Sequence, residues 1–256
     1  MINEQRVLVH PDAAALASSV AARFMTKLID LLDEFDSAHV VLTGGTVGTA
    51  ILRAVNDSPA RDTVDWTRIH FWWGDERFLP AGDPERNDQQ AREALLDSLP
   101  TPEEQIHPFP ASDEITDIEE AADSYARDLQ AAAPDGETHP RFDITFLGVG
   151  PDGHIASLFP DRDIANATDK TVIPVLNAPK PPPERLSLTF PVINSSIRIW
   201  MSLAGADKAP ALGLALAGAA TNEVPVAGIQ GRRRTVFFVD QAAAAQVPEN
   251  LIASTY

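Results

Sequence analysis

The chain has 256 residues, of which 44% are hydrophobic and 22% charged, close to the average of soluble globular proteins. A disordered or fibrous chain is therefore excluded, and the absence of cysteine excludes disulfides and sulfur-based zinc sites. The formal net charge of -17 gives a surface that repels nucleic acid and anionic lipid. We expect one α/β domain over residues 1–256 that binds neither a nucleic acid nor a membrane.

The first residues show no basic segment followed by an apolar one, which predicts no secretory signal. The longest stretch free of both charge and strong polarity, near residues 209–220, is too short and too rich in alanine and glycine to span a bilayer. We therefore expect a cytoplasmic protein.

Short apolar runs and helical spacing alternate along the chain. A strand at residues 6–10 precedes a helix that runs from Leu16 to Phe35, and a strand at 39–43 precedes a helix at 46–55. The remaining predicted elements are a strand at 69–73, a polar loop at 74–87, helices at 88–99 and 115–133, strands at 142–147, 172–176, 186–190 and 197–203, a helix at 207–219 and a strand at 235–239. This alternation indicates a doubly wound, mostly parallel sheet flanked by helices, with room for a small covering lobe.

Three predicted strands end in glycine-bearing segments, at residues 43–46, 73–77 and 148–154. Ligands of such sheets bind at the carboxyl ends of the strands, near a topological switch point. These three segments therefore indicate where a site would lie.

Residues 148–153 match the pattern G-x-G-x-x-G, but a dinucleotide site also needs a full helix after the glycines. Pro160 would end such a helix within about two turns, so the match does not indicate a nucleotide.

The same segment carries Asp152 and His154 on a turn at a strand end. A histidine there suits a general base with the carboxylate as its partner. The other interpretation is a capping aspartate beside an ordinary histidine, and the residues alone leave both open.

Asp75, Glu76 and Arg77 follow a Trp-Trp strand end. They suit an acid pair with an anion-binding guanidinium, or equally an ion-paired surface loop.

Gly44, Gly45 and Thr46 lead into a helix, where free backbone N–H groups and the positive helix end favour a phosphate. The alternative is an ordinary tight turn in which Thr46 caps the helix. No P-loop pattern is present, so hydrolysis of a nucleoside triphosphate is not indicated.

Other chemistries lack their sequence patterns. No G-x-S-x-G motif marks a nucleophile elbow, and the six histidines lack the spacing of metal ligands. The chain has only four lysines, at positions 27, 170, 180 and 208. Lys180 stands in the proline-rich segment 179–183, which is either a rigid connector or an arm that presents this lysine.

In order and spacing, these segments resemble the 6-phosphogluconolactonases of the sugar-phosphate isomerase and deaminase superfamily. The most specific is Leu-Gly-Val-Gly-Pro-Asp-Gly-His-Ile-Ala-Ser-Leu-Phe-Pro at residues 147–160, and residues 205–208 (Gly-Ala-Asp-Lys) also match. The family's glycine loop usually has a proline where this chain has Gly48. The related glucosamine-6-phosphate deaminases carry a glutamate and a tyrosine where this chain has Phe159 and Arg77, which favours the lactonases.

The resemblance implies hydrolysis of a small sugar-phosphate lactone, 6-phospho-D-glucono-1,5-lactone, without a metal or an organic cofactor. His154, oriented by Asp152, would be the general base. The resemblance alone does not assign the acid loop, residues 75–77. Two carboxylates beside an anionic substrate repel it, so we expect Arg77 to face the lactone or its phosphate, while Asp75 or Glu76 holds Arg77 or binds sugar hydroxyls. The other substrate-binding residues that the resemblance implies are Gly44, Gly45, Thr46, Lys180, Arg185 and Lys208. The alternative function is that of a non-enzymatic protein that senses a sugar phosphate by binding it. The sequence does not predict the oligomeric state.

Overall fold

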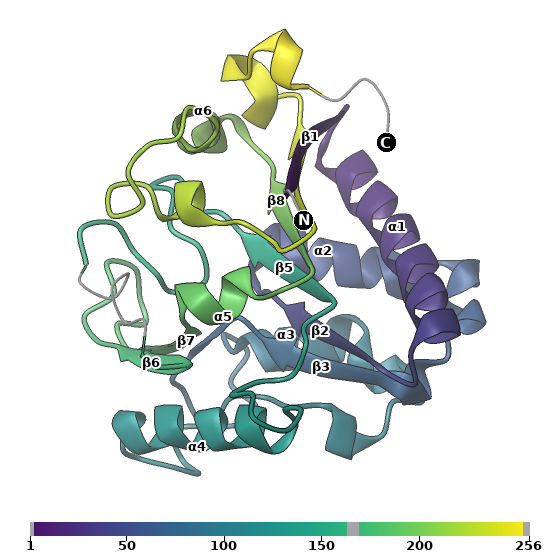
Figure 1. The fold of residues 1–256 in the computed structure, drawn as a ribbon, viewed down its shortest axis with the longest axis vertical. Coiled ribbons are helices and arrows are strands. Elements are labelled where there is room, and N and C mark those ends of the chain that lie inside the picture. The colour runs from purple at the N-terminus through teal and green to yellow at the C-terminus, as the bar shows by residue number, and fades with distance from the viewer. Residues whose placement is uncertain (1–2, 163–168, 253–256) are drawn as a thin grey trace.

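The structure is a computed structural model that describes residues 3–162 and 169–252. A six-stranded sheet in the order β1-β9-β8-β5-β2-β3 forms its centre, and every neighbouring pair in it is parallel (Figure 1). Its strands are β1 (Glu4–His10), β2 (Ala38–Leu42), β3 (Ile69–Trp73), β5 (Ile144–Gly148), β8 (Arg198–Leu203) and β9 (Arg234–Asp240). The predicted doubly wound parallel sheet is confirmed.

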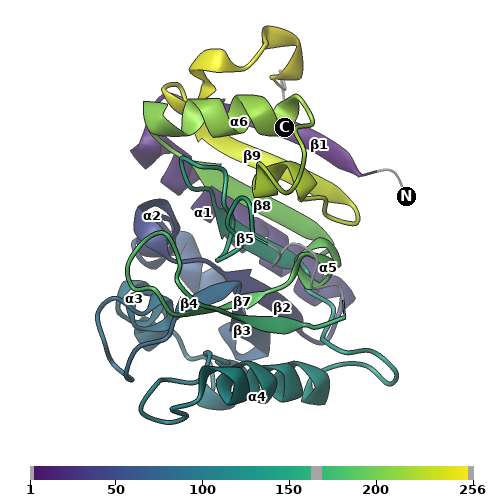
Figure 2. The ribbon, with the colours of Figure 1, turned by 90° about the vertical axis from the view of Figure 1, so that its left-hand side faces the viewer.

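Helices cover both faces of this sheet. They are α1 (Ala13–Glu34), α2 (Gly45–Asn56), α3 (Asn87–Ala94), α4 (Ile118–Ala131), α5 (Phe190–Asn194) and α6 (Ala209–Leu216). Figure 2 shows α1 and α2 behind the sheet, with α5 and α6 on its other face. The Asp12 side chain caps α1 by accepting a hydrogen bond from the Ala15 N–H at 2.8 Å. No helix of the described residues is long and apolar enough to cross a membrane.

A second, antiparallel sheet of three strands lies beside the first. It consists of β4 (Asp75–Arg77), β7 (Arg185–Leu188) and β6 (Val172–Val175), in that order. Gly74 connects the two sheets, because its N–H donates to the Leu42 carbonyl and its own carbonyl accepts from Leu188. The prediction of an uninterrupted loop over residues 74–87 was therefore wrong at β4. A three-residue charged strand carries none of the apolar alternation by which strands are predicted.

Two predicted helices end early. The helix predicted at 88–99 stops at Ala94, where Leu95 leaves helical geometry with φ near -153°, and a short 3₁₀ turn at Leu96–Ser98 follows. Both leucines are buried in the core, so packing overrides the helical spacing there. The helix predicted at 207–219 begins as a 3₁₀ turn at Ala206–Lys208, and α6 ends at Leu216.

The chain changes direction across the sheet at β2. From this strand it passes to β3 on one side, while β5 pairs with β2 on the other. The loops after β2 and β5 therefore diverge at the carboxyl edge, and the Gly148 N–H joins them by donating to Thr43 Oγ1 at 3.2 Å. A ligand cleft is expected at this switch point.

Candidate active site

A cleft of about 750 Å³ lies at this carboxyl edge. The loops after β2, β5 and β8 contribute to it, together with β4, β7 and the proline-rich segment. Among the sequence-predicted site residues, those that line the cleft are Gly44, Gly45, Thr46, Asp75, Arg77, His154, Lys180, Arg185 and Lys208. The tenth, Asp152, contacts His154. The structure therefore brings together residues that lie up to 164 positions apart in the chain.

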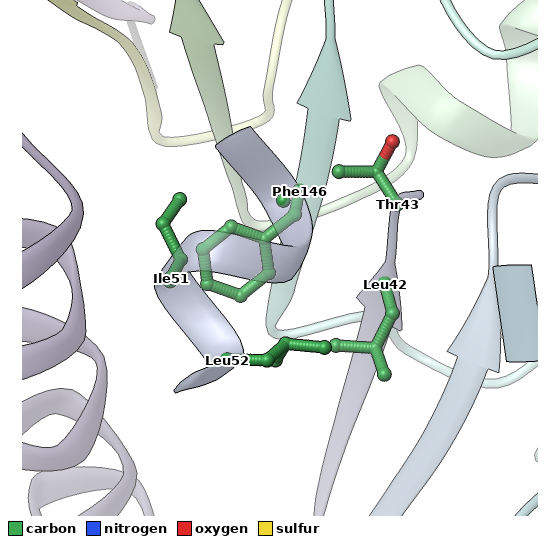
Figure 3. Close-up of a pocket in the computed structure, with 6 residues that line it drawn as sticks. Leu42, Thr43, Ile51, Leu52 and Phe146 are labelled. Atoms are coloured by element: carbon green, nitrogen blue, oxygen red, sulfur yellow. The ribbon is translucent and has the colours of Figure 1, made fainter. Parts of the chain in front are cut away.

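A second pocket lies beneath the glycine loop and is a different kind of space. Figure 3 shows Leu42, Ile51, Leu52 and Phe146 turned toward one another around it, with Thr43 at its edge. Its volume is only about 10 Å³, and its lining is apolar. A void of this size holds at most one water molecule, so the large cleft is the candidate site.

His154 and Asp152 form a pair on the turn after β5. His154 Nδ1 lies 2.5 Å from Asp152 Oδ1, and the turn closes through hydrogen bonds from Gly150 N–H to the His154 carbonyl and from Gly153 N–H to the Gly150 carbonyl. A Cβ atom on Gly150 would stand 2.0 Å from His154 Nδ1, so only glycine leaves room for the ring. No helix follows this turn within residues 150–162, which agrees with the rejection of a dinucleotide fingerprint.

The His154 imidazole packs against an aromatic ring, and its carboxylate partner lies near a lysine. The Phe159 ring lies 4.6 Å from the His154 ring, centroid to centroid. Lys180 Nζ lies 3.9 Å from Asp152 Oδ1. Partial burial acts to raise the pKa of Asp152, but the hydrogen bond with His154 and the charges of His154 and Lys180 outweigh it and lower that pKa to about 2. Asp152 is therefore ionised at neutral pH.

The glycine loop presents an uncapped helix start. Gly44 is the N-cap residue of α2, and no side chain caps this end. Thr46 lies inside the first turn, so the interpretation of Thr46 as the cap is wrong. The 12 residues of α2 supply a helix dipole, and its first N–H groups have no partner among the side chains that the structure describes. This end of the cleft suits an anion.

Lys208 faces the same cleft from the loop after β8. Its Nζ lies 3.3 Å from Asp207 Oδ2. Asp240, at the end of β9, holds this loop by accepting hydrogen bonds from the Gly205 N–H, and it also accepts one from the N–H of Ala243, which follows β9. Asp240 was not predicted, although its place directly after an apolar strand is the signal that drew attention to Asp75.

The carboxylates of β4 are buried, and the interpretation of residues 75–77 as an ion-paired surface loop is wrong. Asp75 is 6% exposed, and its Oδ2 accepts a hydrogen bond from Ser157 Oγ at 2.7 Å. Glu76 is fully buried, and it accepts from the backbone N–H groups of Arg77, Asn87 and Asp88. Burial raises the pKa of Glu76. Glu76 therefore supports the backbone and does not reach a substrate.

Arg77 and Arg185 stand opposite each other in the pairing of β4 with β7, and both line the cleft. Arg77 Nη1 donates to the Glu85 carbonyl and to Asn87 Oδ1 at 2.9 Å, so a neutral amide and a carbonyl hold this guanidinium. Arg185 donates to the carbonyls of residues 180–182. Arg185 thereby fixes the proline-rich segment that carries Lys180, in addition to placing a charge beside the cleft.

Comparisons with known proteins place this arrangement in a family. The family model described as glucosamine-6-phosphate isomerases/6-phosphogluconolactonase matches residues 11–238. The chain belongs to this family.

Individual relatives carry the second of these two names. The 6-phosphogluconolactonase of Streptomyces coelicolor is 48% identical over 98% of both chains, and that of Mycobacterium leprae is 39% identical over 94% of this chain and 98% of its own. The crystal structure of 6-phosphogluconolactonase from Thermotoga maritima superposes with a TM-score of 0.81 at 27% identity, covering 93% of this chain and all of that one. Sequence and fold therefore agree on the family.

Proposed function

We propose that this chain is a 6-phosphogluconolactonase, which hydrolyses 6-phospho-D-glucono-1,5-lactone to 6-phospho-D-gluconate in the oxidative branch of the pentose phosphate pathway. The observation that carries the proposal is the His154–Asp152 pair in a cleft that also contains the uncapped start of α2 and Lys208. The relatives of the same name support it. The proposed site of action is the cytoplasm, and the proposed reaction uses neither a metal nor an organic cofactor.

The geometry suits general-base catalysis by His154. With Nδ1 directed at the ionised Asp152, the Nε2 atom is left to accept a proton from water. The water oxygen then bonds to C1 of the lactone, and collapse of the tetrahedral intermediate breaks the bond between C1 and the ring oxygen. His154 returns the proton to that oxygen. The new carboxylic acid ionises at neutral pH, so each turnover releases one proton.

The surrounding cations suit an anionic substrate. Arg77 or backbone N–H groups of the glycine-rich turns would stabilise the oxyanion. Gly44, Gly45 and Thr46 would bind the phosphate, with charge from Lys180, Arg185 and Lys208. Such local cations are needed because the protein as a whole carries a net charge of -17.

Two alternatives are less well supported. Deaminase chemistry would need an acid where Phe159 packs on the His154 ring. A sensor that only binds the sugar phosphate would need the anion site but no oriented base.

The test is proton release measured at constant pH with freshly generated lactone and chelator-treated protein. We expect release well above the spontaneous rate, in proportion to protein concentration. A protein that binds 6-phosphogluconate but leaves the spontaneous rate unchanged would be a sensor, and this result would overturn the proposal.

A further inference from the structure

Asn87 is a buried amide that the mechanism above does not use. It is the first residue of α3 and is only 3% exposed. Its side chain touches both the strand that carries Arg77 and the loop that carries Gly44. No sequence pattern singled it out.

The hydrogen bonds of Asn87 fix the orientation of its amide. The Oδ1 atom accepts from Arg77 Nη1 at 2.9 Å, while Nδ2 donates to the Asp75 carbonyl at 2.8 Å and lies 3.5 Å from Asp75 Oδ1. A flipped amide would set N–H against guanidinium and oxygen against oxygen. The acceptor therefore points at Arg77.

The same oxygen lies against the glycine loop. A Cβ atom on Gly44 would stand 1.8 Å from Asn87 Oδ1, so the amide and the loop backbone are in direct contact. One side chain thus places the Arg77 cation directly beside the proposed phosphate loop.

Glu76 fixes the backbone of Asn87. Its carboxylate accepts from the N–H groups of Asn87 at 2.6 Å and Asp88 at 2.9 Å, which are orphan donors at the start of α3. The buried carboxylate acts through the helix start and not on a ligand.

We propose that Asn87 is a positioning residue, which holds the Arg77 guanidinium beside the Gly44 loop so that both contact the same anionic substrate. This inference rests on the proposed function for its substrate. A purely structural amide would lower stability when removed, but it would leave the kinetic constants of the folded protein unchanged.

A double-mutant cycle separates these roles, because residues that act through one another have non-additive effects. The variants are Asn87→Ala, Arg77→Met and their combination. Gln89→Ala is the matched control, since this amide lies on the same helix but donates to the exposed Glu93 and not to Arg77. Asn87→Ala combined with Lys208→Ala serves as a pair that is not joined by a hydrogen bond.

We expect Asn87→Ala to lower kcat/KM roughly tenfold or more, as the loss of a hydrogen bond to a charged group predicts. In the Arg77→Met background the same change should cost less than about twofold, whereas beside Lys208→Ala it should keep its full effect. Gln89→Ala should match the wild type. Equal costs of Asn87→Ala in the wild-type and Arg77→Met backgrounds would overturn the proposal. If Asn87→Ala does not fold, Asn87→Ser leaves a smaller void and carries the same expectations.

The cycle is repeated with the affinity for 6-phosphogluconate, measured by calorimetry. This product carries both a phosphate and a carboxylate, so Arg77 affects its binding whichever group it contacts. If wild-type protein releases no protons from the lactone, the proposed function fails. The affinities for 6-phosphogluconate then test the role of Asn87 by themselves. Non-additive effects of Asn87→Ala and Arg77→Met on this affinity would support the inference, and additive effects would refute it.

Discussion

Histidines lie at both ends of the parallel sheet, and their surroundings differ between the two ends. At the carboxyl edge, His154 pairs with the carboxylate of Asp152 and lines an open cleft. Near the amino edge, His39 on β2 stacks on His70 of β3 with ring centroids 4.6 Å apart, and His70 Nδ1 lies 3.1 Å from His107 Nε2.

The surroundings of the amino-edge cluster keep its imidazoles neutral. Trp72 Nε1 donates to His39 Nδ1, and the Trp72 ring stacks on His107. Burial lowers the pKa of His39 to about 3 and that of His107 to about 4, with the neighbouring histidines adding to both shifts. Among the described residues, no group of three or more acidic or histidine side chains is placed to hold a metal ion. The cluster packs the amino edge of the sheet. Within residues 3–162 and 169–252, only His154 has a carboxylate partner beside a cleft.

The largest expected effect tests this contrast directly. His154→Gln should lower kcat for the lactone about 100-fold or more, because the general base is lost. His70→Gln is the matched change at the other end of the sheet and should leave kcat within about twofold of wild type. A His154→Gln enzyme with near-normal kcat would remove His154 from its role and erase the distinction between the two ends.

The second prediction concerns Lys208, which is one of the four cationic side chains that line the cleft among the described residues. Lys208→Ala should raise KM for the phosphorylated lactone roughly tenfold, since an interaction with a charged group is lost, and should affect unphosphorylated gluconolactone less. Lys170→Ala is the control, because Lys170 is half-exposed and 4.0 Å from Glu119 outside the cleft. Equal changes for both substrates in Lys208→Ala would contradict a phosphate contact.

The sequence predicts the inner strands of the central sheet well because β2, β5, β8 and β9 are buried on both faces. Their apolar runs, such as the one ending at Leu42, report burial directly. The strand at Asp75–Arg77 escaped prediction because its side chains are charged and its partner β7 lies about 110 residues further along the chain. Pairing at that distance leaves no local signal.

The candidate site likewise contains some residues that the sequence predicts and others that it does not. Two strand-end glycine segments are visible in the sequence. Close approach of a side chain requires glycine at Gly44 and Gly150, and a positive φ favours it at Gly45 and Gly153.

Asn87 was invisible because its role depends on Arg77 and Gly44, which meet it only in the folded chain. The burial of Glu76 was likewise not predictable. The N–H groups of Asn87 and Asp88 that satisfy its carboxylate belong to the start of α3, whereas its neighbours in the sequence are charged.

The third prediction is a pH dependence of stability at the amino edge. An unfolded histidine has a pKa near 6.5, whereas burial lowers the pKa of His39 to about 3 in the folded protein. Between these values the unfolded state binds more protons, so the stabilisation present above pH 6.5 is lost as pH falls. From pH 7 to 5, His39 alone should cost about 2 kcal/mol of unfolding free energy. Urea unfolding of the wild type and of His39→Gln at both pH values isolates this histidine from Asp143 and Arg141 nearby, because these remain in both proteins. Equal pH slopes for the two proteins would mean that His39 titrates normally, and the contrast between a neutral packed cluster and a carboxylate-paired base would fail.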